Sequence, residues 1–464
     1  MVIRTLLVPV LASAVVVSAG GAALAAPAPG AAQSCPALEV FGIQGTGESS
    51  PDANPKTDTG MLGMMFRPMM AAAPGLIDRT YVDYPASFGG ATAGGPMPYV
   101  QSVDQAVAGM DRAVTDLAKR CPSTMFAGAG YSQGAHAMSM WAKRVGAGTG
   151  PIPAERVAGV ALLADPARPP QAPVFPGRPG TRSPEPVPGT SGSEVARITV
   201  TDPGLGGSGI APLADVDQGY GSLAGRVADI CTPGDLACDA PEHAPIAHLI
   251  TNIAGQSELN PQDPIAAIST VAQALATTSF KTAVPVINED IQGTSLDELS
   301  YEPQKTISQR LAEASDPRTP LPSINDALSA LIKVGTIGFN AVKTVVTKVF
   351  TPETIAELAT VGLANPVAAA MTLGTKIASA TMELVPPAAQ SRLVNEAFTA
   401  LQDNITDNRD LFNVATLVRY SDTIAKHQGY ASVSASPTGQ APVIVAANWF
   451  AAAARDLAAH QGTR

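Results

Sequence analysis

The sequence predicts an α/β fold with a mostly parallel sheet, followed by an all-α C-terminal domain. Short apolar strand-like runs alternate with helical stretches in the first half of the chain, which is the pattern of a three-layer sandwich with helices on both faces of the sheet. From about residue 260, long apolar-periodic stretches punctuated by proline replace this alternation. We therefore expect an α/β domain over residues 26–258 and a helical domain over residues 259–464.

The expected strands are apolar runs bounded by turn residues, at residues 38–43, 80–84, 124–128, 156–163, 195–200 and 226–230. One helix is expected to open at Ser102, where Gln105 completes a capping box. Another is expected over residues 132–145. The segment 166–192 is rich in proline and glycine without periodicity, which predicts a surface excursion within the same domain.

The second half contains seven stretches with helical spacing of apolar residues, at residues 262–279, 304–314, 323–349, 365–383, 388–403, 408–426 and 442–459. No later stretch of the chain has the character of a membrane span, because charged and amide side chains interrupt the best candidate, residues 324–349. No motif in this half indicates whether it binds other components, covers a site in the first half or oligomerises.

Composition and charge exclude some classes of partner. The 464 residues carry a formal net charge of -10, and only 15% of them are charged. No basic run is present that could neutralise phosphates, so we expect no binding to nucleic acid. An acidic balance favours solubility and says little about an uncharged substrate.

The N-terminus has the three parts of a secretory signal peptide. Arg4 supplies a positive charge, residues 6–17 are apolar, and Ala23-Leu24-Ala25 has the small-x-small pattern of a cleavage site. A membrane anchor or a buried helix is the alternative reading. We expect residues 1–25 to be removed, and the mature protein to be secreted or associated with the cell envelope.

Four cysteines follow this segment, and an even number in a secreted chain predicts disulfides. Cys231 and Cys238 are close enough to close one short loop, which leaves Cys35 and Cys121 to pair over a long span. A metal site is the alternative, but no Cys-x-x-Cys pair is present to build it.

The segment Gly130-Tyr131-Ser132-Gln133-Gly134 is a Gly-x-Ser-x-Gly motif between an expected strand and an expected helix. A serine on such a sharp turn is exposed as a nucleophile, and the helix N-terminus directs backbone N–H groups at a developing oxyanion. Ser132 is therefore the expected nucleophile of an acyl-transfer reaction.

The nucleophile needs a base and an acid that orients the base. Of the five histidines, His136 lies one turn beyond Ser132, and His427 and His460 lie in the helical region, which leaves His243 and His248. The acidic residues near these two histidines are Asp229, Asp235, Asp239 and Glu242.

At these residues the chain resembles the cutinase family of α/β-hydrolases, especially its secreted actinobacterial members, over roughly residues 35–255. The Gly-Tyr-Ser-Gln-Gly turn matches the family motif, and the segment from Cys231 to Cys238 matches its Cys-x-x-Gly-Asp-x-x-Cys loop. A histidine follows that aspartate in the family, and His248 fits its spacing. The cysteines at residues 35 and 121 fit the family's first disulfide.

The resemblance implies Asp235 as the orienting acid and His248 as the base, with His243 as the second choice. It implies the disulfides Cys35–Cys121 and Cys231–Cys238. It also implies an oxyanion hole formed by the backbone N–H groups of Gln133 and Thr46, in a loop where Gln44 replaces the arginine usual in the family. No metal or organic cofactor is required.

Together these features predict a secreted serine esterase or lipase that hydrolyses acyl esters. One alternative is an acyltransferase or hydrolase acting on cell-envelope glycolipids such as mycolate-type esters, and another is a non-catalytic envelope protein. Five methionines between residues 61 and 70 form either an apolar rim for acyl chains or a buried helix face.

Overall fold

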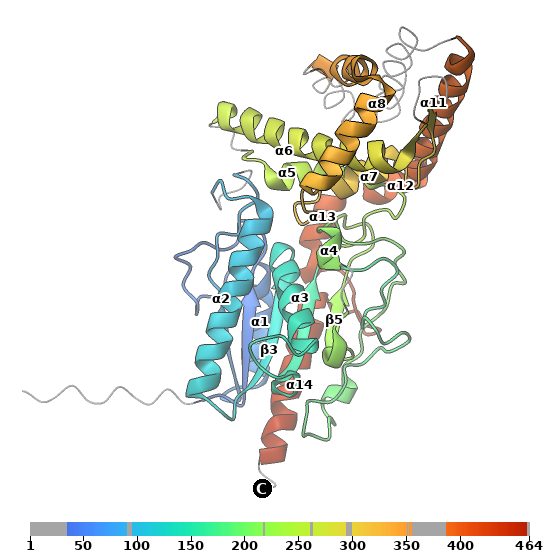
Figure 1. Cartoon of the computed structure of the whole chain (residues 1–464). Helices are drawn as coiled ribbons and strands as arrows, with labels where there is room; N and C mark the ends of the chain where they lie inside the picture. The colour runs from blue at the N-terminus through green and yellow to red at the C-terminus, as the bar shows by residue number, and fades with distance from the viewer. Residues whose placement is uncertain are drawn as a thin grey trace, which may run out of the picture. The chain divides into compact units, whose positions relative to one another are not determined.

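Five strands form a parallel sheet in the computed structural model of the protein (Figure 1). The strand order is β2-β1-β3-β4-β5, and every neighbouring pair is parallel. The strands are β1 (Leu38–Ile43), β2 (Ile77–Tyr81), β3 (Met125–Tyr131), β4 (Val157–Leu163) and β5 (Val227–Ile230). This arrangement confirms the predicted α/β class.

The structure describes residues 35–90, 95–216, 219–259, 263–293, 299–349, 351, 353–354 and 387–461. The expected signal peptide, residues 1–25, and the expected helical stretch 365–383 lie outside these residues. The described helices include none that is both long and apolar enough to cross a membrane.

The helices of the α/β layers connect successive strands or follow them. They are α1 (Gly60–Ala72), α2 (Tyr99–Arg120), α3 (Gln133–Gly146) and the short α4 (Leu213–Val216). Single-turn 3₁₀ segments lie at Ala154–Arg156, Val195–Arg197 and Gly221–Leu223.

The two faces of the sheet belong to separate clusters of buried side chains. In β1, Leu38 and Val40 belong to one cluster, whereas Phe41 and Ile43 belong to the other, as expected for a strand buried on both faces. The first cluster includes side chains of α1, and the second includes side chains of α2 and α3.

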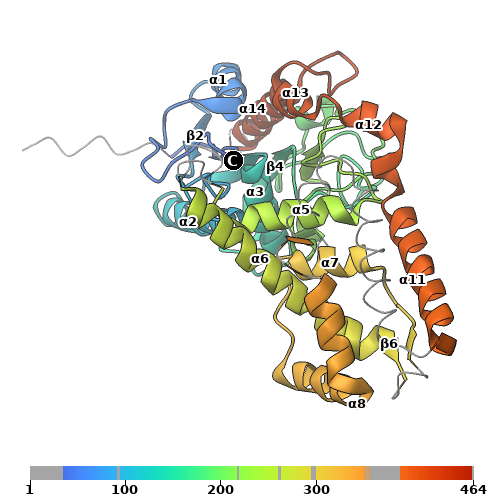
Figure 2. The same cartoon turned by 90° about the horizontal axis from the view of Figure 1, so that it is seen from above.

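The last helix, α14 (Pro442–Gln461), is part of the first cluster. Trp449 and Phe450 are almost completely buried, and a Cβ atom on Gly159 of β4 would lie 2.4 Å from the Trp449 ring. Both views draw α14 beside α1 (Figures 1 and 2). The expected boundary at residue 259 is therefore wrong for the last part of the chain, because α14 completes the α/β core.

The helical part lies between β5 and α14 in the sequence. Its helices are α5 (Pro245–Gln256), α6 (Pro264–Pro285), α7 (Ile307–Ser315), α8 (Ile324–Val349), α11 (Pro387–Asp407), α12 (Val414–Tyr420) and α13 (Thr423–Gln428). Single turns occur at Val286–Asp290, Arg409–Phe412 and Gly429–Ala431, and a two-residue pair joins β6 (Ile291–Gln292) to β7 (Ser300–Tyr301). We refer to residues 259–412 as the helical insertion.

Three local expectations are corrected by the structure. Helix α2 begins at Tyr99, so Ser102 lies inside it, and the Ser102 hydroxyl accepts a hydrogen bond from the Ser87 N–H instead of capping the helix. Residues 195–200 contain a 3₁₀ turn and no strand. The 166–192 segment is not only a surface excursion, because Val174 and Phe175 pack in the core.

The four cysteines are all disulfide-bonded. Cys231 and Cys238 are bonded to each other, as expected, and close a short loop directly after β5. Cys35 and Cys121 are also in the disulfide form.

Candidate active site

Ser132 lies between the end of β3 and the start of α3, in a backbone conformation that side chains rarely adopt (φ 55°, ψ -124°). Such a conformation costs about 1–3 kcal/mol and is typical of a nucleophile held on a sharp turn. The Ser132 N–H donates to the Leu163 carbonyl at the end of β4, 2.9 Å away. This hydrogen bond ties the strained turn to the sheet.

The two glycines of the motif are required by close backbone approach. A Cβ atom on Gly130 would lie 2.5 Å from the Ala135 Cα, within α3. A Cβ atom on Gly134 would lie 2.0 Å from the Ile43 carbonyl oxygen, at the end of β1. Only glycine allows the strand and helix to pack this closely around the serine.

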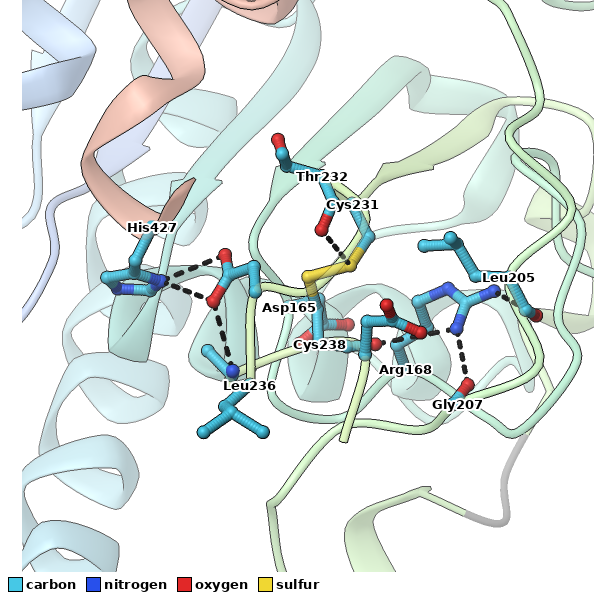
Figure 3. Close-up of a disulfide and its surroundings, with 12 residues drawn as sticks. Asp165, Arg168, Leu205, Gly207, Cys231, Thr232, Leu236, Cys238 and His427 are labelled. Atoms are coloured by element: carbon cyan, nitrogen blue, oxygen red, sulfur yellow. Dashed lines mark hydrogen bonds and ion pairs between the residues drawn. A yellow bond between two sulfur atoms is a disulfide. The ribbon is translucent and has the colours of Figure 1, made fainter. Parts of the chain in front are cut away.

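His427 of α13 is the histidine that contacts Ser132. Its Nε2 lies 2.9 Å from the Ser132 Oγ, and its Nδ1 lies 2.9 and 3.0 Å from the two carboxylate oxygens of Asp235. Figure 3 shows His427 beside the loop that the Cys231–Cys238 disulfide closes. The three side chains form the chain of hydrogen bonds that a nucleophile, a base and an orienting acid require.

The choice of His248 as the base is therefore wrong in geometry. His248 lies on α5, and its side chain has no hydrogen bond to either Ser132 or Asp235 among the described residues. Burial lowers the pKa of His248. His243, the second choice, donates its backbone N–H to Asp410 and also makes no such contact.

Asp235 is fixed on several sides. Its carboxylate accepts hydrogen bonds from the Ala237 N–H at 3.0 Å and from the Tyr430 hydroxyl at 2.9 Å. Its side chain is only 1% exposed, whereas that of His427 is 27% exposed. A buried, fully bonded carboxylate holds the imidazole in one tautomer while the base stays open to the site.

Tyr131 of the serine turn also positions His427. Its hydroxyl donates to the His427 carbonyl at 2.7 Å, and the two rings stack with centroids 5.3 Å apart. Burial raises the pKa of Tyr131, so the phenol stays protonated and remains a donor. The turn that carries the nucleophile therefore also holds the base.

The loop expected to form the oxyanion hole is built around Glu48. The Glu48 carboxylate accepts from the N–H groups of Gly45 and Met61, both at 3.1 Å, and burial raises its pKa. Gln44 donates its side-chain amide to Thr59, so this glutamine bonds the loop to the start of α1.

Thr46 follows in this loop and lines the same cavity as Ser132. Its backbone N–H has no partner among the described residues. The N–H of Gln133 is in the first turn of α3, where backbone donors lack intrahelical acceptors. Two donors are thus available beside the nucleophile.

Two other sequence features have structural roles. His136 is fully buried, and its ring nitrogens contact the Tyr99 hydroxyl and Asp215, so it faces away from the serine. Met61, Met65 and Met69 form the buried face of α1, and none of the five methionines lines the cavity. The buried-face alternative is therefore the correct one. The described residues contain no cluster of three or more potential metal ligands.

The sequence did not indicate His427 as the partner of Asp235, because the two residues are 192 positions apart and the helical insertion lies between them. A signal for it does exist in the sequence. Residues 442–461 are apolar on all sides, which indicates a core helix, and His427 precedes that helix by one short segment. The order serine, aspartate, histidine also holds with His427.

Comparison with known proteins agrees with this architecture. Residues 34–257 match the Cutinase family model. The carboxylesterase Culp6 homolog of Corynebacterium glutamicum is 33% identical over 215 residues, which is 45% of this chain and 66% of that protein. Acetylxylan esterase 2 of Talaromyces purpureogenus is 33% identical over 108 residues, 23% of this chain and 42% of that protein. The chain thus spans less than two thirds of either curated relative.

Solved structures that match part of this chain include the catalytic core domain of acetyl xylan esterase from Trichoderma reesei. It has a TM-score of 0.30 and 20% identity, and the match covers 52% of this chain and 99% of that chain. Lysin B from Mycobacteriophage D29 has a TM-score of 0.33 and 18% identity, with 64% and 99% covered.

Proposed function

We propose that the protein is a serine carboxylesterase that hydrolyses acyl esters through Ser132, His427 and Asp235, because residues 34–257 match the Cutinase family model. The observation that carries the proposal is the position of His427, whose two ring nitrogens bridge the Ser132 hydroxyl and the Asp235 carboxylate. The two curated relatives are named as a carboxylesterase and an acetylxylan esterase, which supports the same reaction class.

In the proposed mechanism, the Ser132 Oγ attacks the ester carbonyl while His427 Nε2 takes the hydroxyl proton. The N–H groups of Gln133 and Thr46 stabilise the oxyanion, and Asp235 stabilises the imidazolium through Nδ1. When the intermediate collapses, His427 gives its proton to the leaving alcohol. Water then attacks the acyl-enzyme with His427 again as the base, which releases the acid and restores Ser132.

The acceptor of the acyl group distinguishes an esterase from an acyltransferase. The His427 side chain is 27% exposed, so solvent reaches the base that activates the acceptor. This exposure supports water as the acceptor. Product analysis with and without a sugar acceptor tests this point, and an acyl-sugar product in place of free acid would contradict it.

We also infer that the protein acts outside the cytoplasm, in association with the cell envelope or free of it. Disulfides persist in oxidising compartments, and all four cysteines are bonded. The signal-like residues 1–25 support the same conclusion. Fractionation of the producing cells, with N-terminal sequencing of the mature protein, tests it.

Substitution of Ser132, His427 and His248 tests the triad. Ser132→Ala and His427→Ala should each lower kcat/KM for p-nitrophenyl esters by at least about 1,000-fold, because each removes a member of one catalytic unit. His248→Gln is the matched control and should keep the wild-type rate. A fluorophosphonate probe should label the wild-type protein and not Ser132→Ala.

Two outcomes would overturn the proposal in different ways. If Ser132→Ala remained active, Ser132 would not be the nucleophile, and the proposed serine-esterase mechanism would be refuted. If His427→Ala were fully active and His248→Gln lost activity, the protein would still be an esterase, but His248 would be its base in place of His427.

A further inference from the structure

A cavity of about 280 Å³ lies beside the proposed triad. Ser132, His427 and Asp235 all contribute to its wall. Apart from these three, its lining contains no charged side chain among the described residues, and most of it is apolar. A cavity of this kind suits a hydrocarbon group that must be held against the nucleophile.

The cavity has two walls of different origin. One wall comes from the α/β core and includes Phe88, Tyr99 and Pro166. The other comes from chain that follows Asp235, and it includes Gly255 of α5 and Pro317, which lies between α7 and α8 in the helical insertion. The opposite walls thus come from segments far apart in the sequence.

The second wall is held firmly against the core. Arg318 forms ion pairs with Asp104 of α2, at 2.7 Å, and with Asp215 of α4, at 3.1 Å. The Asp316 carboxylate accepts the Leu213 N–H at 2.8 Å. Pro317 therefore lies between two residues that are both anchored to the α/β core.

The two parts of this second wall, α5 and residues 315–318, are hydrogen-bonded to each other. The Asn252 amide donates to the Ser315 hydroxyl at 3.1 Å, and the Gln256 amide donates to the Ser315 carbonyl at 2.6 Å. These bonds and the ion pairs of Arg318 make the wall a preorganised surface. A preorganised wall can discriminate between substrates by size.

We infer that this cavity binds the acyl chain of the ester and that α5 and residues 315–318 set the length of chain accepted; this inference rests on the proposed esterase function. A volume of 280 Å³ equals roughly nine water molecules at about 30 Å³ each, and a methylene group is similar in size to a water molecule. Because part of this volume must also hold the ester group, the pocket fits a medium-length acyl chain of up to about eight carbons better than a palmitoyl chain. Each methylene it buries strengthens binding about fourfold.

Gly255 is the position at which this selection can be altered with least disturbance. A Cβ atom there would lie 3.4 Å from the Tyr99 Cβ and 4.0 Å from the Phe88 Cζ, both ordinary contact distances. The Tyr99 and Phe88 side chains that line the cavity therefore lie next to residue 255, and a longer side chain at this position must take up space beside these two rings. Glycine within a helix is otherwise unfavourable, so its replacement does not weaken α5 itself.

The test compares wild type and Gly255→Leu on acetyl, butyryl, octanoyl and palmitoyl p-nitrophenyl esters. Wild type should have its highest kcat/KM with octanoyl ester. Gly255→Leu should lose at least about tenfold on octanoyl ester, since several methylenes lose their site, and should retain acetyl ester hydrolysis. Gly255→Ala, which adds one methyl group, should show a smaller shift in the same direction and is the fallback if Gly255→Leu does not fold.

The matched control is Gly335→Leu, the same substitution in α8 at a position where the described residues leave open space around a Cβ atom. It should leave the chain-length profile unchanged. A wild-type protein inactive on all four esters would refute the esterase function. If the wild type is active but both Gly255 variants keep its chain-length profile, the inference about the acyl pocket alone is refuted. The same holds if both variants lose activity equally on every ester.

Discussion

At the scale of single residues, the tyrosine three positions after His427 has a specific role. Tyr430 is fully buried, and its hydroxyl donates to Asp235 while accepting the Thr232 N–H at 3.0 Å. Burial raises its pKa well above the ordinary value, so it remains a donor. Tyr430 therefore positions Asp235 and bonds the disulfide loop at two points to the segment that follows α13.

Replacement of Tyr430 by phenylalanine should lower kcat about tenfold, because a hydrogen bond to a charged group contributes about 1.5–3 kcal/mol and part of it orients Asp235. The free energy of unfolding should fall by about 1–3 kcal/mol, because the buried Thr232 N–H loses its acceptor. Steady-state kinetics and urea unfolding measure the two effects.

Tyr420→Phe provides the control for this substitution. The Tyr420 hydroxyl donates to the Asp239 carbonyl at 2.6 Å and does not touch the triad. This variant should lose stability without a change in kcat. An unchanged kcat in Tyr430→Phe would show that Asp235 needs no help from the tyrosine.

The residues that could be predicted from the sequence are those whose geometry is local. Ser132 lies in a five-residue turn, and Asp235 lies in a loop closed by a disulfide of sequence separation 7. His427 reaches Asp235 only through tertiary packing, so spacing along the chain gave no information about it. The short sequence distance from Asp235 to His248 was misleading, because it indicates the base only when no insertion separates the acid from the base.

At the scale of elements, strand and helix positions could be predicted where burial follows a simple period. The apolar runs of β1 and β4 and the 3.6-residue pattern of α8 match the expected ranges closely. The partner of each helix could not be predicted in this way, because an apolar face does not specify what covers it. The apolar stretch at 442–459 predicted a helix, but not its position on the sheet.

His248 on α5 should make the stability of the protein depend on pH. Burial lowers its pKa below the ordinary value of 6.5 in the folded protein. Between the lowered pKa and 6.5 the unfolded chain binds more protons than the folded one, so stability rises with pH across this window. The stabilisation is complete above 6.5 and is lost as pH falls through the folded pKa.

We expect His248→Gln to remove this part of the pH dependence, since glutamine does not titrate. The measurement is the free energy of unfolding in urea for both proteins, at pH values on each side of 6.5. The two stability curves should converge or cross as pH falls, while esterase activity at neutral pH stays equal. Parallel curves would show that His248 does not contribute to the acid sensitivity.

At the scale of the whole molecule, the α/β core is discontinuous in sequence. The family-matched residues 34–257 supply the sheet, Ser132 and Asp235, whereas the proposed base, His427, and the covering helix come from residues 423–461. The helical insertion separates the two parts. The chain segments before and after most of the helical part lie close together, since the Ile246 N–H donates to the Asn408 side chain at 3.0 Å.

This organisation predicts that one shortened chain fails to fold and that another one folds. A chain that ends at residue 258 loses α14, so one sheet face loses Trp449, Phe450 and their neighbours. Each fully buried large apolar side chain contributes about 1.5–3 kcal/mol, so the loss of several of them is comparable to the 5–15 kcal/mol that stabilises a typical domain. This chain should be insoluble or unfolded by circular dichroism, and inactive.

The matched chain replaces residues 247–407 by a short glycine-serine linker between Ile246 and Asn408. It keeps Ser132, Asp235, His427 and α14, so it should unfold cooperatively on heating and hydrolyse acetyl ester. It lacks Gly255 and Pro317, so its preference for octanoyl over acetyl ester should disappear. A folded, active chain ending at residue 258 would contradict the discontinuous core, because neither His427 nor α14 would then be needed.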